Sequence, residues 1–431
     1  MKRFPLLRLA FASAAIVSVL PSPSGAAVLF KTDFNASPVA AWSGAAAKVG
    51  TVDTLGGAEA SGGILLNAKN VASGLLPLQN TETNLGKLTL SFSLSASFNR
   101  PVTVRVESFD ATRKRTGGLE TKIYPAAPDF YQRYALDLST LKATGAGRFQ
   151  PTAPFVQFTM VASDGSAESE IRLDNVNYST PAFYVSPKGS DTSDGRTEKT
   201  AFATPQKAVD AAQAGDIIVL MGGLYNAGLN PSVAFRRAGA PDAWIVLKNY
   251  PGQTPTLKSN GWNMISIAAG SKEKIDTDTR LNYLEVRGLH VRGEGDVAKK
   301  KYPEAMNKSD SRTNSNGIAA DGRYMANPPH HLRFADNVVE YCPGQGLGAL
   351  EADWVTIENN TSRFNCWTTI YATSGISIMG ASNFDAADNV YKMLIRNNIC
   401  HRNETFEIWE AIKKPSDGNG IILDVNQKTE S

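Results

Sequence analysis

The chain has 431 residues, of which 20% are charged, and its formal net charge is +3. This length accommodates two or three domains, and its three cysteines are too few for a disulfide-stabilised scaffold. No basic run is longer than three residues, as at 299–301, and this argues against nucleic acid as a partner, because phosphate binding needs clustered Lys and Arg.

Residues 1–26 have the pattern of a secretory signal peptide. A basic start is followed by an apolar stretch from Leu9 to Leu20 and by small residues at 24–27. The stretch is too short to span a bilayer, and Pro21 and Pro23 disfavour the alternative of a buried first helix. We therefore expect a secreted or periplasmic protein with no membrane span.

Residues 28–180 predict an antiparallel β-sandwich of jelly-roll type. Short alternating segments such as 88–94, 102–106 and 155–160 are separated by Gly, Asn and Pro turns. The segment 170–178 resembles the last strand of carbohydrate-binding jelly rolls. That resemblance implies a structural calcium near Asp33 and Asp174; solvated carboxylates at strand ends are the alternative.

A short amphipathic helix is predicted after the sandwich. Thr204 is a good N-cap before Pro205, Ala208 and Val209 begin an apolar stripe, and Gly215 ends the helix. A helix at this place would cover the open end of a solenoid.

Two short units then recur along the chain. One begins with Gly and alternates apolar and polar residues, with intervals of 29, 29 and 45 residues between the glycines Gly317, Gly346, Gly375 and Gly420. The other ends in an asparagine and recurs after 23 and then 38 residues, at Asn337, Asn360 and Asn398. Period-two alternation predicts strands with one buried face, and a repeat near 23 residues predicts a parallel β-helix whose turn asparagines stack.

The run from Phe183 to Tyr225, closing with Gly222-Gly223-Leu224-Tyr225, resembles the N-terminal cap of pectin-lyase-like right-handed parallel β-helix proteins. The closest resemblance is to family 9 polysaccharide lyases and their uncharacterised relatives, and it covers 181–431. It implies an all-β fold in which a sandwich precedes a right-handed solenoid. In the names used for such solenoids, PB1 contains the Gly-led strands, PB2 contains Phe334, Ile357 and Ile395, and PB3 contains Val339, Ser362 and Cys400.

Inserted segments flank PB1 and predict a groove there. They lie at 293–315, 380–391 and 404–419, and long loops in a compact fold are more often functional than idle. The outward row of PB1 has small residues such as Ala319, Gly348 and Ser377, which predicts room for an extended chain.

Aromatic and cationic residues gather in or beside these insertions. Aromatic faces next to cations suit sugar rings that carry carboxylates. The predicted substrate-binding residues are Trp367, Tyr371, His401, Arg402 and Trp409, with loop packing as the alternative.

Five carboxylates fall at or beside the ends of PB1 strands. Calcium takes six to eight oxygen ligands, several of them carboxylates. The candidate ligands are Asp321, Glu351, Asp353, Asp417 and Asp424, with scattered solvated acids as the alternative.

The resemblance implies β-elimination with a Lys or Arg base, and Lys413 beside Lys414 is the candidate. Adjacent ammonium groups disfavour each other's charge, which favours the free amine. The chain departs from the family pattern, because Asp417-Gly418-Asn419-Gly420 keeps only part of its aspartate cluster. The family's base lies a further coil on, and no PB2, PB3 or cap follows Asp424, so we expect a truncated product or fragment.

We therefore expect a monomeric polysaccharide lyase-like protein acting on an acidic polysaccharide such as pectate. The alternative is a non-catalytic polysaccharide-binding or adhesion protein. No Gly-His-Gly motif accompanies paired aspartates, so hydrolysis ranks lower. Cys342 and Cys366, one coil apart, would be either a disulfide or free buried thiols.

Overall fold

The structure is a computed structural model that describes residues 28–32, 42–43, 47–52, 61–67, 70–98, 100–125, 131–162, 170–381, 391–409, 412–415 and 417–425. The expected signal segment at 1–26, Asp33 and the residues beyond Val425 lie outside this part of the chain. Within it, no helix has the length and apolar character needed to cross a membrane.

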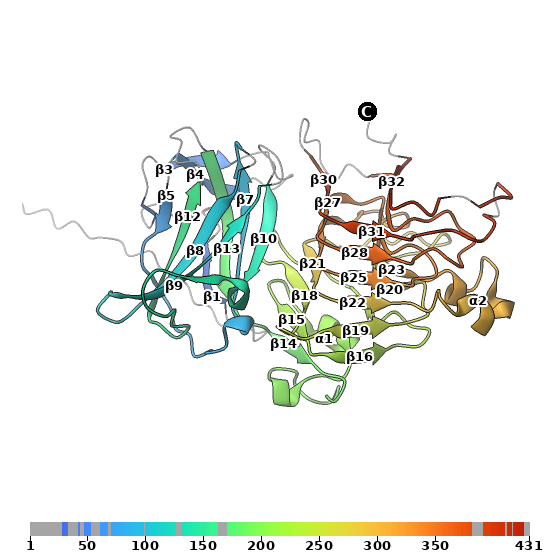
Figure 1. The fold of residues 1–431 in the computed structure, drawn as a ribbon, viewed down its shortest axis with the longest axis horizontal. Helices are drawn as coiled ribbons and strands as arrows, with labels where there is room; N and C mark the ends of the chain where they lie inside the picture. Colours follow the sequence, from blue (N-terminus) through green and yellow to red (C-terminus); the bar gives the residue numbers. More distant parts are fainter. Residues whose placement is uncertain are drawn as a thin grey trace, which may run out of the picture.

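The first unit is a sandwich of two antiparallel sheets (Figure 1). One sheet has the order β10-β7-β13-β4-β3 with β1 beside β13, and its strands are β1 Val28–Thr32, β3 Ala47–Val52, β4 Ser61–Asn67, β7 Thr89–Ala96, β10 Gln132–Asp137 and β13 Glu170–Ser179. The other has the order β11-β9-β8-β12-β5-β2 with β6 beside β12, and its strands are β2 Trp42–Ser43, β5 Asn70–Ser73, β6 Leu76–Pro77, β8 Val102–Phe109, β9 Arg115–Ile123, β11 Lys142–Thr144 and β12 Phe155–Ala162. Alternate residues of β8, such as Val102 and Val104, are fully buried between the sheets, as period two requires.

The second unit is a solenoid of three parallel sheets (Figure 1). The PB2 sheet contains β14 Phe183–Val185, β15 Ile217–Leu220, β18 Ile245–Asn249, β21 Leu284–Arg287, β24 His330–Ala335, β27 Asp353–Glu358 and β30 Met393–Arg396. The PB3 sheet contains β16 Gly223–Asn226, β19 Pro255–Lys258, β22 His290–Arg292, β25 Val338–Glu340, β28 Thr361–Arg363 and β31 Ile399–His401. The PB1 sheet contains β17 Val233–Ala234, β20 Asn263–Ala268, β23 Asn316–Asp321, β26 Leu347–Leu350, β29 Ile376–Met379 and β32 Ile421–Asp424. The predicted fold class, an antiparallel sandwich before a parallel β-helix, is confirmed.

The glycine-led strands stack as predicted. Ile318 pairs with Leu347, and Leu347 with Ile376, in one register. All three side chains are fully buried in the solenoid core.

The predicted asparagine ladder is also present. The Oδ1 atom of Asn360 accepts from both the backbone N and the Nδ2 of Asn337, each at 3.0 Å. Asn398 accepts from Asn360 in the same way, at 2.9 and 3.0 Å. The ladder therefore satisfies buried turn groups that water cannot reach.

Helix α1, Pro205–Ala211, covers the first coil. The Thr204 hydroxyl accepts from the backbone N of Lys207 at 3.3 Å, and the Gln206 amide binds both the N–H and the carbonyl of Ala234 in the edge strand β17. The cap helix is thus confirmed at its predicted start. A second helix, α2 (Ala298–Lys301), lies in the 293–315 insertion on the side of the solenoid away from the sandwich (Figure 1).

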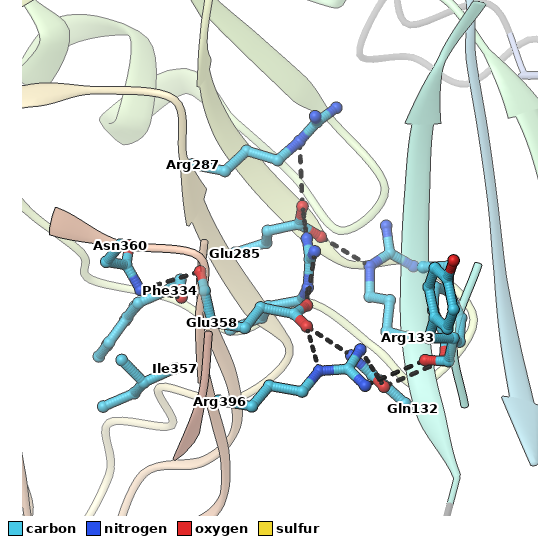
Figure 2. Close-up of polar contacts among 12 residues, drawn as sticks. Gln132, Arg133, Glu285, Arg287, Phe334, Ile357, Glu358, Asn360 and Arg396 are labelled. Atoms are coloured by element: carbon cyan, nitrogen blue, oxygen red, sulfur yellow. Dashed lines mark hydrogen bonds and ion pairs between the residues drawn. The ribbon is translucent and has the colours of Figure 1, made fainter. Parts of the chain in front are cut away.

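The sandwich packs against the outer face of PB2 through buried ion pairs (Figure 2). From β10, Arg133 pairs with Glu285 at 2.9 Å and Gln132 donates to Glu358 at 2.9 Å. Within PB2, Arg333 joins these two carboxylates, at 2.6 Å and 2.8 Å. At the end of β10, Asp137 pairs with Lys248 and Arg287. In the last PB2 strand, Arg396 pairs with Glu358. Edge strand β10 thereby covers a charged face that would otherwise be exposed.

The cysteines of the described residues are free thiols. Cys342 and Cys366 lie on neighbouring coils as predicted, where the N–H of Cys366 donates to the carbonyl of Cys342 at 3.0 Å. Burial raises the pKa of both thiols. Of the two alternatives, the structure has buried thiols.

Candidate functional site

The outward-facing residues of PB1 are less exposed than the sequence predicts. Ser266, Ala319, Gly348 and Ser377 follow one another in register, yet Ala319 is only 2% exposed and Ser377 only 8%. A Cβ at Gly348 would meet the Gln345 side chain at 2.1 Å, so this amide lies over the small residue. Polar side chains at the strand starts therefore close much of the expected floor.

Three long loops between PB3 and PB1, at 293–315, 364–375 and 402–420, are joined into one structure that we call the loop wall. The Thr369 hydroxyl donates to Asn314 at 2.9 Å, and the indole N–H of Trp367 donates to the Arg402 carbonyl at 3.2 Å. Lys299 pairs with Glu407 at 2.6 Å. These contacts cross from each loop to another, so the wall is held by side chains rather than by strand pairing.

An array of rings and cations lies where the loop wall leaves PB3. Tyr341 and Phe364 stack at 5.0 Å and 15°, and Trp367 meets both rings edge-on at 5.8 and 5.9 Å. Phe406, 55% exposed, lies 5.8 Å from Trp367. Arg292 lies over Tyr341 at 4.2 Å. We call this array the aromatic–cation strip, consisting of Arg292, Tyr341, Arg363, Phe364, Trp367, His401, Arg402 and Phe406.

Backbone geometry aligns the strip along the solenoid. Tyr341, Phe364 and Arg402 each follow a PB3 strand and have φ of 54°, 58° and 50°. A left-handed residue at the same place in successive coils projects its side chain to the same side. The PB3 residues just before them, Glu340, Arg363 and His401, also share one register, which continues to Arg292 in the previous coil. Rings and cations therefore lie at matching places on coils about 4.8 Å apart, with the carboxylate of Glu340 between Arg292 and Arg363.

A buried carboxylate organises the cations of the strip. Glu340 is 7% exposed and pairs with His290 at 3.0 Å, Arg292 at 3.3 Å and Arg363 at 2.8 Å. Burial alone would raise the pKa of this carboxyl, but the hydrogen bonds from Arg363 and His290 hold it below its usual value. Arg363 is held by one carboxylate yet keeps 42% of its side chain exposed.

Three of the five predicted substrate-binding residues fall in the strip, namely Trp367, His401 and Arg402. The ring of His401 meets Phe364 edge-on at 5.4 Å, and Arg402 is exposed. Tyr371 lies elsewhere on the loop wall, where its hydroxyl donates to the Lys308 carbonyl at 2.8 Å. Trp409 begins a tight turn whose other end is Lys414.

That turn also holds both predicted catalytic lysines. The N–H of Lys413 donates to the Trp409 carbonyl at 2.9 Å, and the N–H of Trp409 donates to the Lys414 carbonyl at 3.0 Å. Both lysine side chains are exposed. They project from the loop that also holds Phe406.

The five predicted calcium ligands do not gather at one point. Asp321 and Asp424 occupy the same register three coils apart, which is about 14 Å. Asp321 pairs with Arg323 at 2.6 Å, and Asp353 is 1% exposed beside Lys392. Glu351 follows β26, whereas Asp417 lies before β32, at the other end of PB1.

Among the described residues, no three His, Cys, Asp or Glu side chains are arranged to hold a metal ion. The five PB1 carboxylates therefore do not fit one shared calcium site. In the sandwich, Asp174 is 4% exposed, and its Oδ1 accepts from the N–H of Asn175.

Tyr341, Phe364 and Phe406 were not predicted from the sequence. Tyr341 and Phe364 were detectable, because each lies four residues after a ladder asparagine, at the place that Arg402 holds in the next coil. A second asparagine ladder was also not predicted. Asn365 donates to Asn403 at 3.0 Å, but its neighbour in the previous coil is Cys342, which breaks the pattern.

No family model matches the chain, and no curated protein matches it. Among solved structures, pectate lyase Pel9A is similar with 14% identity and a TM-score of 0.34, over 56% of this chain and 58% of that one. The family 11 carbohydrate-binding module of cellulase Lic26A-Cel5E from Clostridium thermocellum has 14% identity and a TM-score of 0.26, over 35% of this chain and 94% of that one. XylC, solved with xylose, has 11% identity and a TM-score of 0.32, over 50% of this chain and 58% of that one. Likeness at this level says nothing about activity.

Proposed function

We propose that this chain is an exported, polysaccharide lyase-like protein that binds an acidic, uronate-containing polysaccharide such as pectate along the aromatic–cation strip. The observation that carries the proposal is the strip itself. Its rings and arginines lie along one axis on neighbouring coils, and Glu340, which shares their register, is buried, so an extended polymer with regularly spaced carboxylates would meet rings and cations. Ring faces suit the apolar faces of sugars, and guanidinium groups suit uronate carboxylates.

The finer part of the proposal is cleavage by β-elimination. The free amine of Lys413 or Lys414 would take the proton from the carbon next to the uronate carboxylate. A carbon–carbon double bond then forms, the glycosidic carbon–oxygen bond breaks, and the leaving oxygen takes up a proton. Arg402 would offset the charge that develops on the carboxylate. Calcium dependence stays a prediction, because the carboxylates at PB1 are dispersed.

That dispersal, together with the exposure of both lysines, favours a second candidate: binding without cleavage. Ultraviolet absorbance of the unsaturated product separates the two. The assay uses pectate, alginate and glycosaminoglycans, each with calcium and with chelator. Lack of product from every polymer, alongside retained binding, would leave the non-catalytic candidate.

Binding along the strip is tested by affinity electrophoresis on pectate. Arg363→Gln and Phe406→Ala should each weaken retention by about tenfold, on the order of 1.4 kcal/mol. Lys142→Gln, an exposed cation on β11 of the sandwich, is the matched charge control. Retention should also fall as salt is added, because exposed charge pairs are screened. Equal retention of Arg363→Gln and wild type would rule out the strip as the binding surface.

The catalytic lysines are tested by Lys413→Gln and Lys414→Gln, which keep side-chain length but remove the amine. The variant lacking the base should lose product formation by at least a hundredfold while still binding pectate. Lys299→Gln, which loses only the pair with Glu407 on the same wall, is the control. An unchanged rate in both lysine variants would dispose of this assignment.

A further inference from the structure

A hollow of about 420 Å³ lies where the sandwich meets the turns between PB2 and PB3. The sandwich contributes Asp137 and Ser139 to its lining, from the end of β10 and the 3-10 turn Leu138–Thr140. The solenoid contributes Gln253, Arg287, His290 and Asp336 from three successive coils. Neither unit forms this hollow by itself, and ligand sites are frequent at such junctions.

Buried, mutually bonded groups fix the lining. Asp137 is 9% exposed and Arg287 is 7% exposed, and their side chains pair at 2.8 Å. His290 is held at both ring nitrogens, by Thr256 at 3.1 Å and by Glu340 at 3.0 Å. Such a site is ordered before a ligand arrives, so binding would cost little side-chain entropy.

The chemistry of the lining matches hydroxyl groups. The exposed Asp336 carboxylate accepts, and the Gln253 amide and Ser139 hydroxyl can both donate and accept, whereas Asp137 and Arg287 are already bonded to each other and form the back of the hollow. Because charges of both signs are present, the hollow does not select for an anion. Burial raises the pKa of the Asp336 carboxyl, against the opposing effect of Arg333 and Arg287, although its side chain still reaches solvent at the hollow.

We propose that this hollow is a binding site for a neutral sugar unit, of monosaccharide to disaccharide size. Its volume is at the low end of the range of small-ligand sites. The hollow lies at the start of the PB3 strands and the aromatic–cation strip at their end, and Glu340 contacts both, through His290 and Arg363. The site does not depend on whether the strip binds a polyuronate.

The test is saturation-transfer NMR on the full chain with methyl glycosides of glucose, galactose, mannose and xylose. Ser139→Trp fills the hollow from an exposed position, and Lys142→Trp adds the same ring to β11 as the control. Asp336→Asn keeps shape and tolerates the positive φ of 57° at this position, so it tests the carboxylate without disturbing the turn.

At least one glycoside should show transfer in wild type and in Lys142→Trp. Affinity should fall by at least fivefold in Ser139→Trp and by about tenfold in Asp336→Asn, a fall on the scale of one hydrogen bond to a charged group. Pectate retention should be the same in all four proteins, which separates this site from the strip. Absence of transfer from every glycoside, or undiminished affinity in Ser139→Trp, overturns the proposal.

Discussion

Three of the turns between PB2 and PB3 place one residue in the left-handed region and follow it with a ladder asparagine. Gly288, Asp336, Asn359 and Asn397 have φ between 54° and 69°, and the residue after each of the last three is a ladder asparagine. The left-handed residue reverses the chain, while the asparagine amide satisfies the backbone of the coil below. The two roles explain why adjacent positions tolerate such different residues.

Because the two residues of the turn have different roles, their substitutions should have different effects on stability. Asn360→Ala should reduce the free energy of unfolding by about 1–3 kcal/mol, because it leaves the buried N–H of Asn337 unsatisfied. Asn359→Gly, one residue earlier and exposed, keeps a residue that suits φ of 57° and should change stability by less than about 0.5 kcal/mol. Urea denaturation of the two variants gives both values. Equal losses would show that the amide ladder does not stabilise this turn.

The strand registers and the asparagine ladder could be predicted from the sequence because their residues repeat from coil to coil. The registers of Ile318, Leu347 and Ile376 and the ladder through Asn337 and Asn360 follow from period two and from coil length. The face joined to the sandwich does not repeat. Glu285 and Glu358 alternate with apolar residues as solvated carboxylates would, and their partners on β10 lie 152 and 226 residues away. Nothing local indicates that pairing.

The loop wall was predicted only in part, because the expected insertions at 293–315 and 404–419 belong to it but its loop at 364–375 was not expected. Trp367 was predicted to contact sugar, with loop packing as the alternative. In the structure Trp367 also joins two loops, through its hydrogen bond to Arg402 and its contact with Phe406. Because loss of Trp367 would also disturb the two loops, Phe406 and Arg363 are better probes of binding.

The joining role predicts a local loss of order. Trp367→Ala should increase amide hydrogen exchange in both 364–375 and 402–409, because one ring holds the two loops together. Tyr371→Phe removes only the hydroxyl bond to Lys308 and should leave 402–409 unchanged. Exchange measured by mass spectrometry on peptides from both loops decides the matter. Faster exchange confined to 364–375 in Trp367→Ala would contradict the bridge.

At the scale of the whole molecule, the ion pairs between the units make folding sensitive to acid. Although burial opposes ionisation, Arg333, Arg133 and Arg287 lower the pKa of Glu285 to about 2. The pKa values of Asp137 and Glu358 are also lowered by their cationic partners, against the effect of burial. A lowered pKa in the folded state contributes stability that is present above the unfolded value, about 4.3 for Glu, and is lost as pH falls toward the folded value.

The melting temperature should therefore fall steeply between about pH 4.5 and 2. Glu285→Gln cannot ionise, so its melting temperature should depend less on pH across this window, although it should be lower at neutral pH. Glu120→Gln should flatten the profile less, because the hydrogen bond from Arg105 that lowers the pKa of Glu120 lies at a half-exposed pair. Calorimetry from pH 7 to pH 2 tests both. A wild-type profile in Glu285→Gln would show that acid acts elsewhere.

The same network determines whether the sandwich is a fixed part of the molecule or a tethered module. Arg133 is the one cation that β10 gives to Glu285, and it also lies over Trp244 at 4.9 Å. Arg133→Ala should cost about 1.5–3 kcal/mol, because it removes a hydrogen bond to a charged group while Arg333 and Arg287 still pair with Glu285. The solenoid retains its own coils and core, so the loss should appear as separation of the units rather than as global unfolding. Small-angle scattering should then show a larger radius of gyration with unchanged far-ultraviolet circular dichroism.

Arg105→Ala, which breaks a half-exposed pair within the sandwich, should leave scattering unaltered. An unchanged radius in Arg133→Ala would mean that apolar packing alone docks the two units.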